Sequence, residues 1–178
     1  MKPLVYCILD TKTFVGNVIK FFTRSSFAHT AIWDYENDVW IEPSGKFNHW
    51  RFNTEYLTTY KPSAYLEVYA LNVEKKYYHY AMRFYRYLAE INCPYNWLGV
   101  IGFVLPFFTS NGGYFCSEGC WEGLRFAKYV PSLIPGWKFS PDEFRDFLLT
   151  QRADELYSGS FLRFKKTKDN ILEKIRKQ

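Results

Sequence analysis

The stretch GGYFCSEGCWEGL, residues 112–124, places Cys116 in what reads as the first turn of a helix. A glycine pair precedes it, and glycine adopts the backbone conformations that tight turns require. The N-terminus of a helix offers free N–H groups and the positive end of the helix dipole, which favour a thiolate and can stabilise an oxyanion. A lone cysteine among aromatic residues is nevertheless more often a small core residue, so this stretch alone does not identify a nucleophile.

A cysteine nucleophile needs a base, and the chain offers only three histidines. His29 lies in SSFAHTAIW (25–33) at the beginning of a predicted strand, which would hold an imidazole rigidly. His49 lies in a loop-like stretch, and His79 lies among tyrosines in the middle of a predicted helix. We therefore favour His29 as the base, although a lone histidine on a strand is also commonly a half-buried structural residue.

A third residue is expected to orient the imidazole. If residues 29–33 and 39–43 pair as a hairpin, Glu42 lies opposite His29 or Thr30. A carboxylate at that position would accept from the imidazole N–H and stabilise the imidazolium. Glutamate in an apolar strand is costly unless it is paired, but an exposed residue at the edge of the sheet is an equally good interpretation.

The order of predicted elements favours an α+β domain, because strands and helices mix without a regular βαβ alternation. Residues 44–53 read as a loop, 97–108 as a buried helix and 159–164 as a final strand. Further strands are predicted at 3–10, 28–33, 38–43 and 64–72, and helices at 13–24, 73–92, from about 116 onward, and at 140–149.

Length and composition indicate one folded domain. The chain has 178 residues, of which 48% are hydrophobic and 21% aromatic, and this excludes a disordered protein. We assign residues 1–164 to the domain and 165–178 to a basic C-terminal tail or helix. The net charge of +5 is mild, and no nucleic-acid signature accompanies it, so nucleic acid is not an expected partner. The tail is either solvated or a contact for a membrane surface.

The four cysteines indicate neither a disulfide scaffold nor a metal site. Cys116 and Cys120 are four residues apart, with no second pair of ligands nearby, and Cys7 and Cys93 are isolated. We expect no metal and no cofactor. The N-terminal apolar run is too short for a signal peptide, which favours a cytoplasmic location in a reducing compartment.

Four stretches, SSFAHTAIW, VWIEP, PYNWLG and YFCSE, together resemble the NlpC/P60 superfamily of papain-like cysteine hydrolases. Non-permuted members carry a PYxWGG stretch, then a DCSG stretch with the nucleophile, and their histidine comes later. In this chain the histidine comes first. That order resembles the circularly permuted branch, which includes the YiiX/YaeF-like proteins, poxviral relatives and lecithin:retinol acyltransferase-like enzymes. The resemblance covers most of residues 1–127, and the opening FTRSSFAH is also YiiX-like.

The resemblance implies a permuted papain-like fold, in which a small antiparallel sheet or half-barrel packs against helices. It also implies roles for individual residues. Cys116 would be the nucleophile, His29 the base and Glu42 the polar third member. Tyr95, in PYNW, would lie near the cysteine, where its hydroxyl can help to hold an oxyanion.

The resemblance also extends to the residues that follow the nucleophile. Ser117 and Glu118 match the CSE of YiiX-like members, which places them near the oxyanion or the substrate, with Glu118 in a structural or substrate-contacting role. The gap between PYNWLG and Cys116 is longer than in the bacterial enzymes and is filled by apolar residues, so the substrate stays open.

From the residues and the resemblance together, we expect a cysteine-dependent hydrolase of the amidase or peptidase type. Its substrate would be an amide, such as a peptidoglycan stem peptide or another γ-linked peptide, and its mechanism would pass through an acyl-enzyme. Two alternatives stay open: a lipid acyl hydrolase or acyltransferase, and a catalytically silent papain-like binding module. A chain without a signal peptide also fits a virus- or phage-encoded protein, and its oligomeric state is open.

Overall fold

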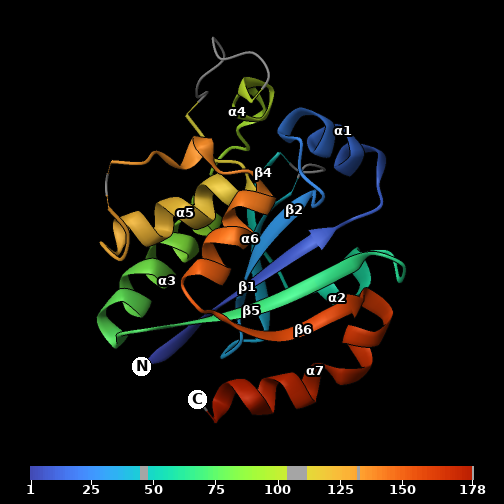
Figure 1. Ribbon diagram of the computed structural model, residues 1–178, viewed down its shortest axis with the longest axis vertical. Helices are drawn as coiled ribbons and strands as arrows, with labels where there is room; N and C mark the ends of the chain where they lie inside the picture. Colours follow the sequence, from blue (N-terminus) through green and yellow to red (C-terminus); the bar gives the residue numbers. More distant parts are fainter. Residues whose placement is uncertain (45–47, 104–111, 132, 178) are drawn as a thin grey trace.

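A computed structural model describes residues 1–44, 48–103, 112–131 and 133–177. Within these ranges the centre of the molecule is an antiparallel sheet of six strands in the order β4-β3-β2-β1-β5-β6 (Figure 1). The α+β class predicted from the sequence is confirmed. The strands are β1 (Lys2–Asp10), β2 (His29–Asp34), β3 (Val39–Ser44), β4 (His49–Asn53), β5 (Tyr65–Val73) and β6 (Asp154–Ser160).

Helices cover both faces of the sheet. Tyr6 on β1 contacts the ring of Phe144. The preceding residue, Val5, pairs with Trp33, whose ring contacts Phe164. Successive strand residues point to opposite faces, so the helices that carry these two phenylalanines lie on opposite sides, as Figure 1 shows. The helices are α1 (Phe14–Thr23), α2 (Tyr56–Thr59), α3 (Lys75–Glu90), α4 (Trp97–Gly102), α5 (Cys116–Phe126), α6 (Pro141–Thr150) and α7 (Phe161–Arg176), with a 3₁₀ turn η1 (Gly136–Lys138).

Helix α5 packs unusually close to its neighbours because two glycines face them. A Cβ atom at Gly119 would lie 2.1 Å from the Trp50 ring, and one at Gly123 would lie 2.0 Å from the Tyr85 ring. The Tyr85 hydroxyl also donates to the carbonyl of Cys120 at 2.7 Å. These contacts hold α5 against α3 and β4, and they fix the direction in which its N-terminus points.

The C-terminal part of the chain differs from the prediction. The strand predicted at 159–164 is wrong for most of its length, because β6 ends at Ser160 and α7 begins at Phe161. The predicted domain boundary between 164 and 165 falls inside α7. The apolar residues of this helix recur at helical spacing and lie in the main core, so residues 165–176 belong to the domain. They are Phe161, Phe164, Ile171, Leu172 and Ile175.

The stretch predicted as a loop at 44–53 contains an edge strand, β4, which was missed. Trp50 and Asn53 are buried, and the residues between them are half-buried or exposed. The other predicted strands and helices are present with small shifts at their ends. Of the helix predicted at 97–108, α4 covers 97–102 and residues 104–108 lie outside the described residues, as do 109–111 of the predicted glycine turn.

None of the helices in the described part of the chain combines the length and apolarity that crossing a lipid bilayer requires.

Candidate active site

The imidazole of His29 and the carboxylate of Glu42 meet at one end of the sheet. His29 Nε2 lies 3.1 Å from Glu42 Oε2, and both side chains are buried. The register is one residue from the prediction: Ile32 pairs with Ile41, so Glu42 continues the ladder next to Ala31. His29 and Ala31 are two residues apart and share a face, so the contact is diagonal rather than directly opposite.

Glu42 is a buried carboxylate with several donors rather than an exposed edge residue. Its side chain is 2% exposed. Asn53 Nδ2 donates to its Oε1 at 2.7 Å, and the Tyr60 hydroxyl donates to its Oε2 at 2.6 Å. Arg51 Nη2 lies 3.8 Å from Oε1. Burial alone would raise the pKa of Glu42, but the hydrogen bonds from His29, Tyr60 and Asn53 outweigh it and lower the pKa below its usual value.

His29 has the opposite shift. Burial would lower its pKa, but hydrogen bonds to Cys116 and Glu42 and the charge of Glu42 outweigh that effect and raise the pKa from 6.5 to about 10. The ring is therefore an imidazolium at neutral pH, and it donates its Nε2 proton to Glu42. Because Nε2 donates to Glu42, Nδ1 is the ring nitrogen that can face the Cys116 sulfur.

Cys116 lies at the first position of α5, beside both residues that the sequence assigned to it. The pKa of the His29 imidazole and that of the Tyr95 hydroxyl are both raised by the Cys116 sulfur, which places the sulfur next to these two side chains. Burial, followed by the charge of a Cys116 thiolate, raises the pKa of Tyr95 well above its usual value, so the hydroxyl keeps its proton. The free N–H groups of the first helical turn point toward the same end of α5.

Backbone contacts hold Tyr95 in place. The Tyr95 N–H donates to the carbonyl of Asn48 at 2.8 Å, and Pro94 forms a β-bridge with His49. On the other side, the Tyr114 N–H donates to the carbonyl of Pro94 at 3.1 Å. The PYN segment is thus held between edge strand β4 and the residues that lead into α5. This arrangement brings Tyr95 to Cys116 although 20 residues separate them in sequence.

Glu118 connects the Tyr95 segment to α5. Its Oε2 accepts from the Phe115 N–H and from Asn96 Nδ2, each at 3.1 Å. Asn96 in turn caps α4, because its Oδ1 accepts from the Gly99 N–H at 2.8 Å. Burial raises the pKa of Glu118 to about 7, and the two hydrogen bonds oppose that rise. In this structure Glu118 holds neighbouring segments together and does not line the cleft described below.

Ser117 also turns away from the sulfur. Its hydroxyl donates to the carbonyl of Phe139 at 2.7 Å, and its side chain is fully buried. The Phe139 ring stacks on Trp121 with centroids 3.9 Å apart. Ser117 therefore secures the first turn of α5 to the segment before α6, instead of facing an oxyanion or substrate.

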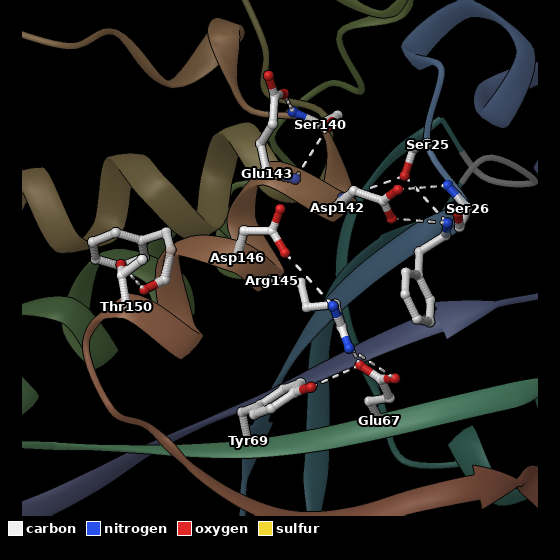
Figure 2. Close-up of polar contacts among 12 residues, drawn as sticks. Ser25, Ser26, Glu67, Tyr69, Ser140, Asp142, Glu143, Arg145, Asp146 and Thr150 are labelled. Atoms are coloured by element: carbon white, nitrogen blue, oxygen red, sulfur yellow. Dashed lines mark hydrogen bonds and ion pairs between the residues drawn. The ribbon is translucent and has the colours of Figure 1, made fainter.

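Helix α6 reaches the strand of His29 through Asp142, as Figure 2 shows. The Asp142 carboxylate accepts from the N–H groups of Ser26 at 2.7 Å and Phe27 at 3.2 Å, just before β2. The Asp142 N–H donates in return to Ser25 Oγ at 3.3 Å. Through Ser117 and Asp142, the segment 139–142 thus contacts both α5, which begins at Cys116, and the residues just before His29.

The same helix is anchored to the sheet one turn further along. Arg145 Nε donates to Glu67 Oε2 at 2.5 Å, and the Tyr69 hydroxyl donates to the same oxygen at 2.8 Å (Figure 2). This partly buried ion pair joins α6 to β5, away from Cys116. It fixes α6 to the sheet and so supports the contact of Asp142 with the residues before His29.

A cleft of about 540 Å³ opens above the pair His29 and Glu42. Tyr95 also lines it, whereas Cys116 does not, and Cys116 is only 1% exposed. The sulfur is thus buried next to two residues that line the cleft, His29 and Tyr95. Contact with a substrate requires the sulfur to emerge between these two side chains. The remaining wall is largely apolar and includes Val15, Gly16, Ile19, Ala28, Pro43 and Tyr60.

Neither a protein-family model nor a curated protein sequence matches this chain. The site is therefore defined by its own geometry. Cys116, His29, Glu42 and Tyr95 lie together, whereas Ser117 and Glu118 point into the surrounding structure. Among the described residues, no group of three or more His, Cys, Asp or Glu side chains is arranged to hold a metal ion.

Sequence reasoning did not find three residues that support the site. Asn53 and Tyr60 hydrogen-bond to Glu42, and Asp142 holds the residues before His29. The alternation of polar and aromatic residues in HWRFN is a signal for the strand that carries Asn53. Nothing in the sequence indicates which side chains Tyr60 and Asp142 contact, because their partners are 18 and 116 residues away.

Proposed function

We propose that this protein is a cysteine-dependent hydrolase of the amidase or peptidase type with a permuted papain-like arrangement. The observation that carries the proposal is the His29 imidazole, which lies 3.1 Å from the Glu42 carboxylate and beside Cys116, whose sulfur contributes to its raised pKa. A nucleophile, a base and a group that orients the base are the three parts that thiol hydrolysis requires. The three residues come from α5, β2 and β3, which are rigid elements.

The proposed reaction begins with attack of the Cys116 thiolate on an amide carbonyl carbon. The new C–S bond gives a tetrahedral oxyanion, which the Cys116 backbone N–H and the Tyr95 hydroxyl stabilise. The oxyanion collapses, the C–N bond breaks, and the His29 imidazolium gives its proton to the leaving amine. A thioester and a neutral imidazole remain.

Hydrolysis of the thioester restores the enzyme. Neutral His29 removes a proton from water, and the resulting hydroxide adds to the thioester carbon. Collapse of this second intermediate breaks the C–S bond, releases the carboxylic acid and returns the thiolate and imidazolium. Glu42 accepts the Nε2–H throughout, so it favours the imidazolium and keeps Nδ1 directed at the sulfur.

A second candidate function is the hydrolysis or transfer of an acyl ester by the same thiolate. The observation that favours it is the cleft wall, in which apolar groups of Val15, Ile19 and Pro43 predominate over charged ones. Such a wall suits an alkyl chain as well as an apolar peptide side chain. A panel of γ-linked peptide amides and long-chain acyl esters, assayed with the same enzyme preparation, distinguishes the two candidates.

The thiol chemistry can be tested without a known substrate. All four cysteines are buried, but burial raises the pKa of the Cys7, Cys93 and Cys120 thiols, and only Cys116 lies beside an imidazole at the cleft. We therefore expect iodoacetamide to alkylate Cys116 in the native protein at neutral pH much faster than the other three. Mass spectrometry of digested samples gives each rate separately. The variant His29→Gln should lower the rate at Cys116 and leave the other three unchanged.

Two outcomes would contradict the hydrolase proposal. Equal, slow labelling of all four cysteines until the protein is denatured would show that the Cys116 sulfur is sealed and would favour a silent binding module. Full retention of turnover by Cys116→Ala on a substrate from the panel would show that another group is the nucleophile.

A further inference from the structure

Helix α1 has two apolar sides that face different surroundings. Gly16 and Ile19 line the cleft, and Ile19 belongs to the small core beneath it. On the other side, Phe14 is 83% exposed and Phe21 is 75% exposed. The helix is well formed, since Thr13 Oγ1 caps it by accepting from the Gly16 N–H at 3.0 Å. The exposed rings therefore project from an ordered element.

Two exposed phenylalanines of α1 form a row with the half-buried Val18 between them. Phe14, Val18 and Phe21 are spaced i, i+4 and i+7, so they lie along one line of the helix, about 10 Å from end to end. Val15 is 42% exposed and also lines the cleft, which connects this row to the cleft mouth. A single exposed apolar side chain is ordinary, whereas a row beside a cleft indicates a contact surface.

Basic residues lie at both ends of α1 and beside the cleft. Lys12 and Lys20 each form an ion pair with Asp10, so one carboxylate serves two cations. Arg24 is exposed at the C-terminal end of α1, and Lys61 lies nearby, where its Nζ donates to the Lys12 carbonyl at 3.2 Å. Among these five side chains four are cationic and one is anionic, so the surface is complementary to an anionic partner.

We propose that the outer side of α1, formed by Phe14, Val18 and Phe21 with the basic residues around them, binds an anionic lipid surface. Rings that protrude from a convex helix enter the region between lipid headgroups and acyl chains, while lysine and arginine contact the headgroups. A stable protein partner buries about 800 Å² on each side, and a single short helical row provides few of those contacts.

The basic C-terminal segment is a less suitable membrane contact than α1. The apolar residues of α7 pack into the main core, among them Ile171, Leu172 and Ile175. An interfacial helix inserts an exposed apolar side into the lipid. The apolar side of α7 is instead buried in the core of the protein. The membrane contact that the sequence suggested for residues 165–178 is therefore assigned to α1 instead.

Vesicle sedimentation tests the proposal with the full chain. We expect the protein to sediment with phosphatidylcholine vesicles that contain phosphatidylserine, and less with phosphatidylcholine alone. The variant Phe14→Ser/Phe21→Ser should weaken binding at least about tenfold, because each ring contributes apolar burial at the interface. The matched control is Leu133→Ser, which removes an equally exposed apolar side chain (89% exposed) elsewhere on the molecule.

A second variant tests how much the cations contribute to lipid binding. Lys12→Asn/Arg24→Asn removes two cations, and asparagine tolerates the left-handed backbone at these positions, where φ is 52° and 53°. This variant should lose the preference for phosphatidylserine and the sensitivity of binding to salt. Binding should be unchanged in Cys116→Ala, so the result does not depend on the hydrolase chemistry.

Three outcomes would overturn the proposal. The first is a wild-type protein that sediments with neither vesicle. The second is an equal loss of binding in Leu133→Ser and in the double phenylalanine variant. The third is a concentration-dependent dimer that the phenylalanine variant converts to a monomer, which would assign the row to a second copy of the chain.

Discussion

Glu42 Oε2 lies 3.1 Å from His29 Nε2, and the same oxygen accepts from the Tyr60 hydroxyl at 2.6 Å. The imidazole therefore donates to a carboxylate that is itself held in place by a second donor. This relationship makes the protonation state of His29 depend on Glu42, which leads to the first prediction.

Glu42→Gln should lower the pKa of His29 from about 10 toward 6.5, because an amide oxygen stabilises the imidazolium far less than a carboxylate does. Chemical shifts of labelled histidine rings across a pH titration measure this directly, with His49 and His79 as internal controls. Turnover on any identified substrate should fall about 10²–10⁴-fold. An unchanged His29 titration in Glu42→Gln would contradict the role of Glu42.

The raised pKa of His29 also predicts how stability depends on pH. A folded-state pKa above the unfolded value of 6.5 contributes stability that is fully present below 6.5 and is lost as the pH rises through about 10. The difference in free energy of unfolding between wild type and His29→Gln should therefore shrink over this window. Urea titrations at fixed pH values measure it, and a difference that grows with pH would contradict the assignment.

Tyr95→Phe removes the hydroxyl whose pKa the Cys116 sulfur raises and retains the ring, which packs against Trp97 with centroids 4.6 Å apart. We expect kcat to fall about 10²-fold while KM and thermal stability change little, since an oxyanion donor acts mainly in the transition state. Trp97→Phe is the control for packing. A rise in KM at constant kcat would show that Tyr95 binds substrate and does not stabilise the oxyanion.

Glu118→Gln should flatten the dependence of stability on pH. The pKa of Glu118 is raised from 4.5 to about 7, so its protonated form is favoured in the folded state. The stability that this preference contributes is fully present below pH 4.5 and is lost as the pH rises through about 7. Glutamine keeps an oxygen that can accept from Phe115 and Asn96 and carries no charge. At pH 8 the variant should be more stable than wild type, by on the order of 3 kcal/mol. Denaturation curves at pH 4.5 and pH 8 test this, and a less stable variant at pH 8 would contradict it.

Asp142→Ala should disturb the chemistry of Cys116 from a distance. It removes the acceptor of the Ser26 and Phe27 N–H groups, which precede the strand of His29. A small displacement of the imidazole can cost up to about 10²-fold in rate. We expect slower alkylation of Cys116 and a shifted pH profile of that rate.

Two further variants separate positioning from general stability. Asp142→Asn retains an accepting oxygen and should recover part of the alkylation rate. Asp146→Asn changes a carboxylate on the solvent side of the same helix, with a side chain 69% exposed, and should leave the profile unchanged (Figure 2). A loss of thermal stability in Asp142→Ala with an unaltered alkylation profile would limit Asp142 to a structural role.

The sequence predicted the local elements of the fold well where periodicity was strong. The strand of His29 and the helix that begins at Cys116 are both present, as is the helix at 140–149 with its cap at Ser140. These elements depend on interactions between residues within a few positions of one another, which a single sequence displays. Edge strand β4 was missed because its alternation spans only five residues and is flanked by loop-like composition.

The sequence by itself determined the candidate residues, since the chemistry of Cys116, His29 and Glu42 and the glycine-rich approach to α5 can be read from residue types and their order. Only the tertiary structure decided which of them meet. It joined His29 to Glu42 diagonally, one residue from the predicted register, and it turned Ser117 and Glu118 toward Phe139 and Asn96. It also moved the last helix into the core. Register, side-chain direction and burial depend on contacts between residues far apart in the chain, and the balance of those contacts cannot be read from local pattern.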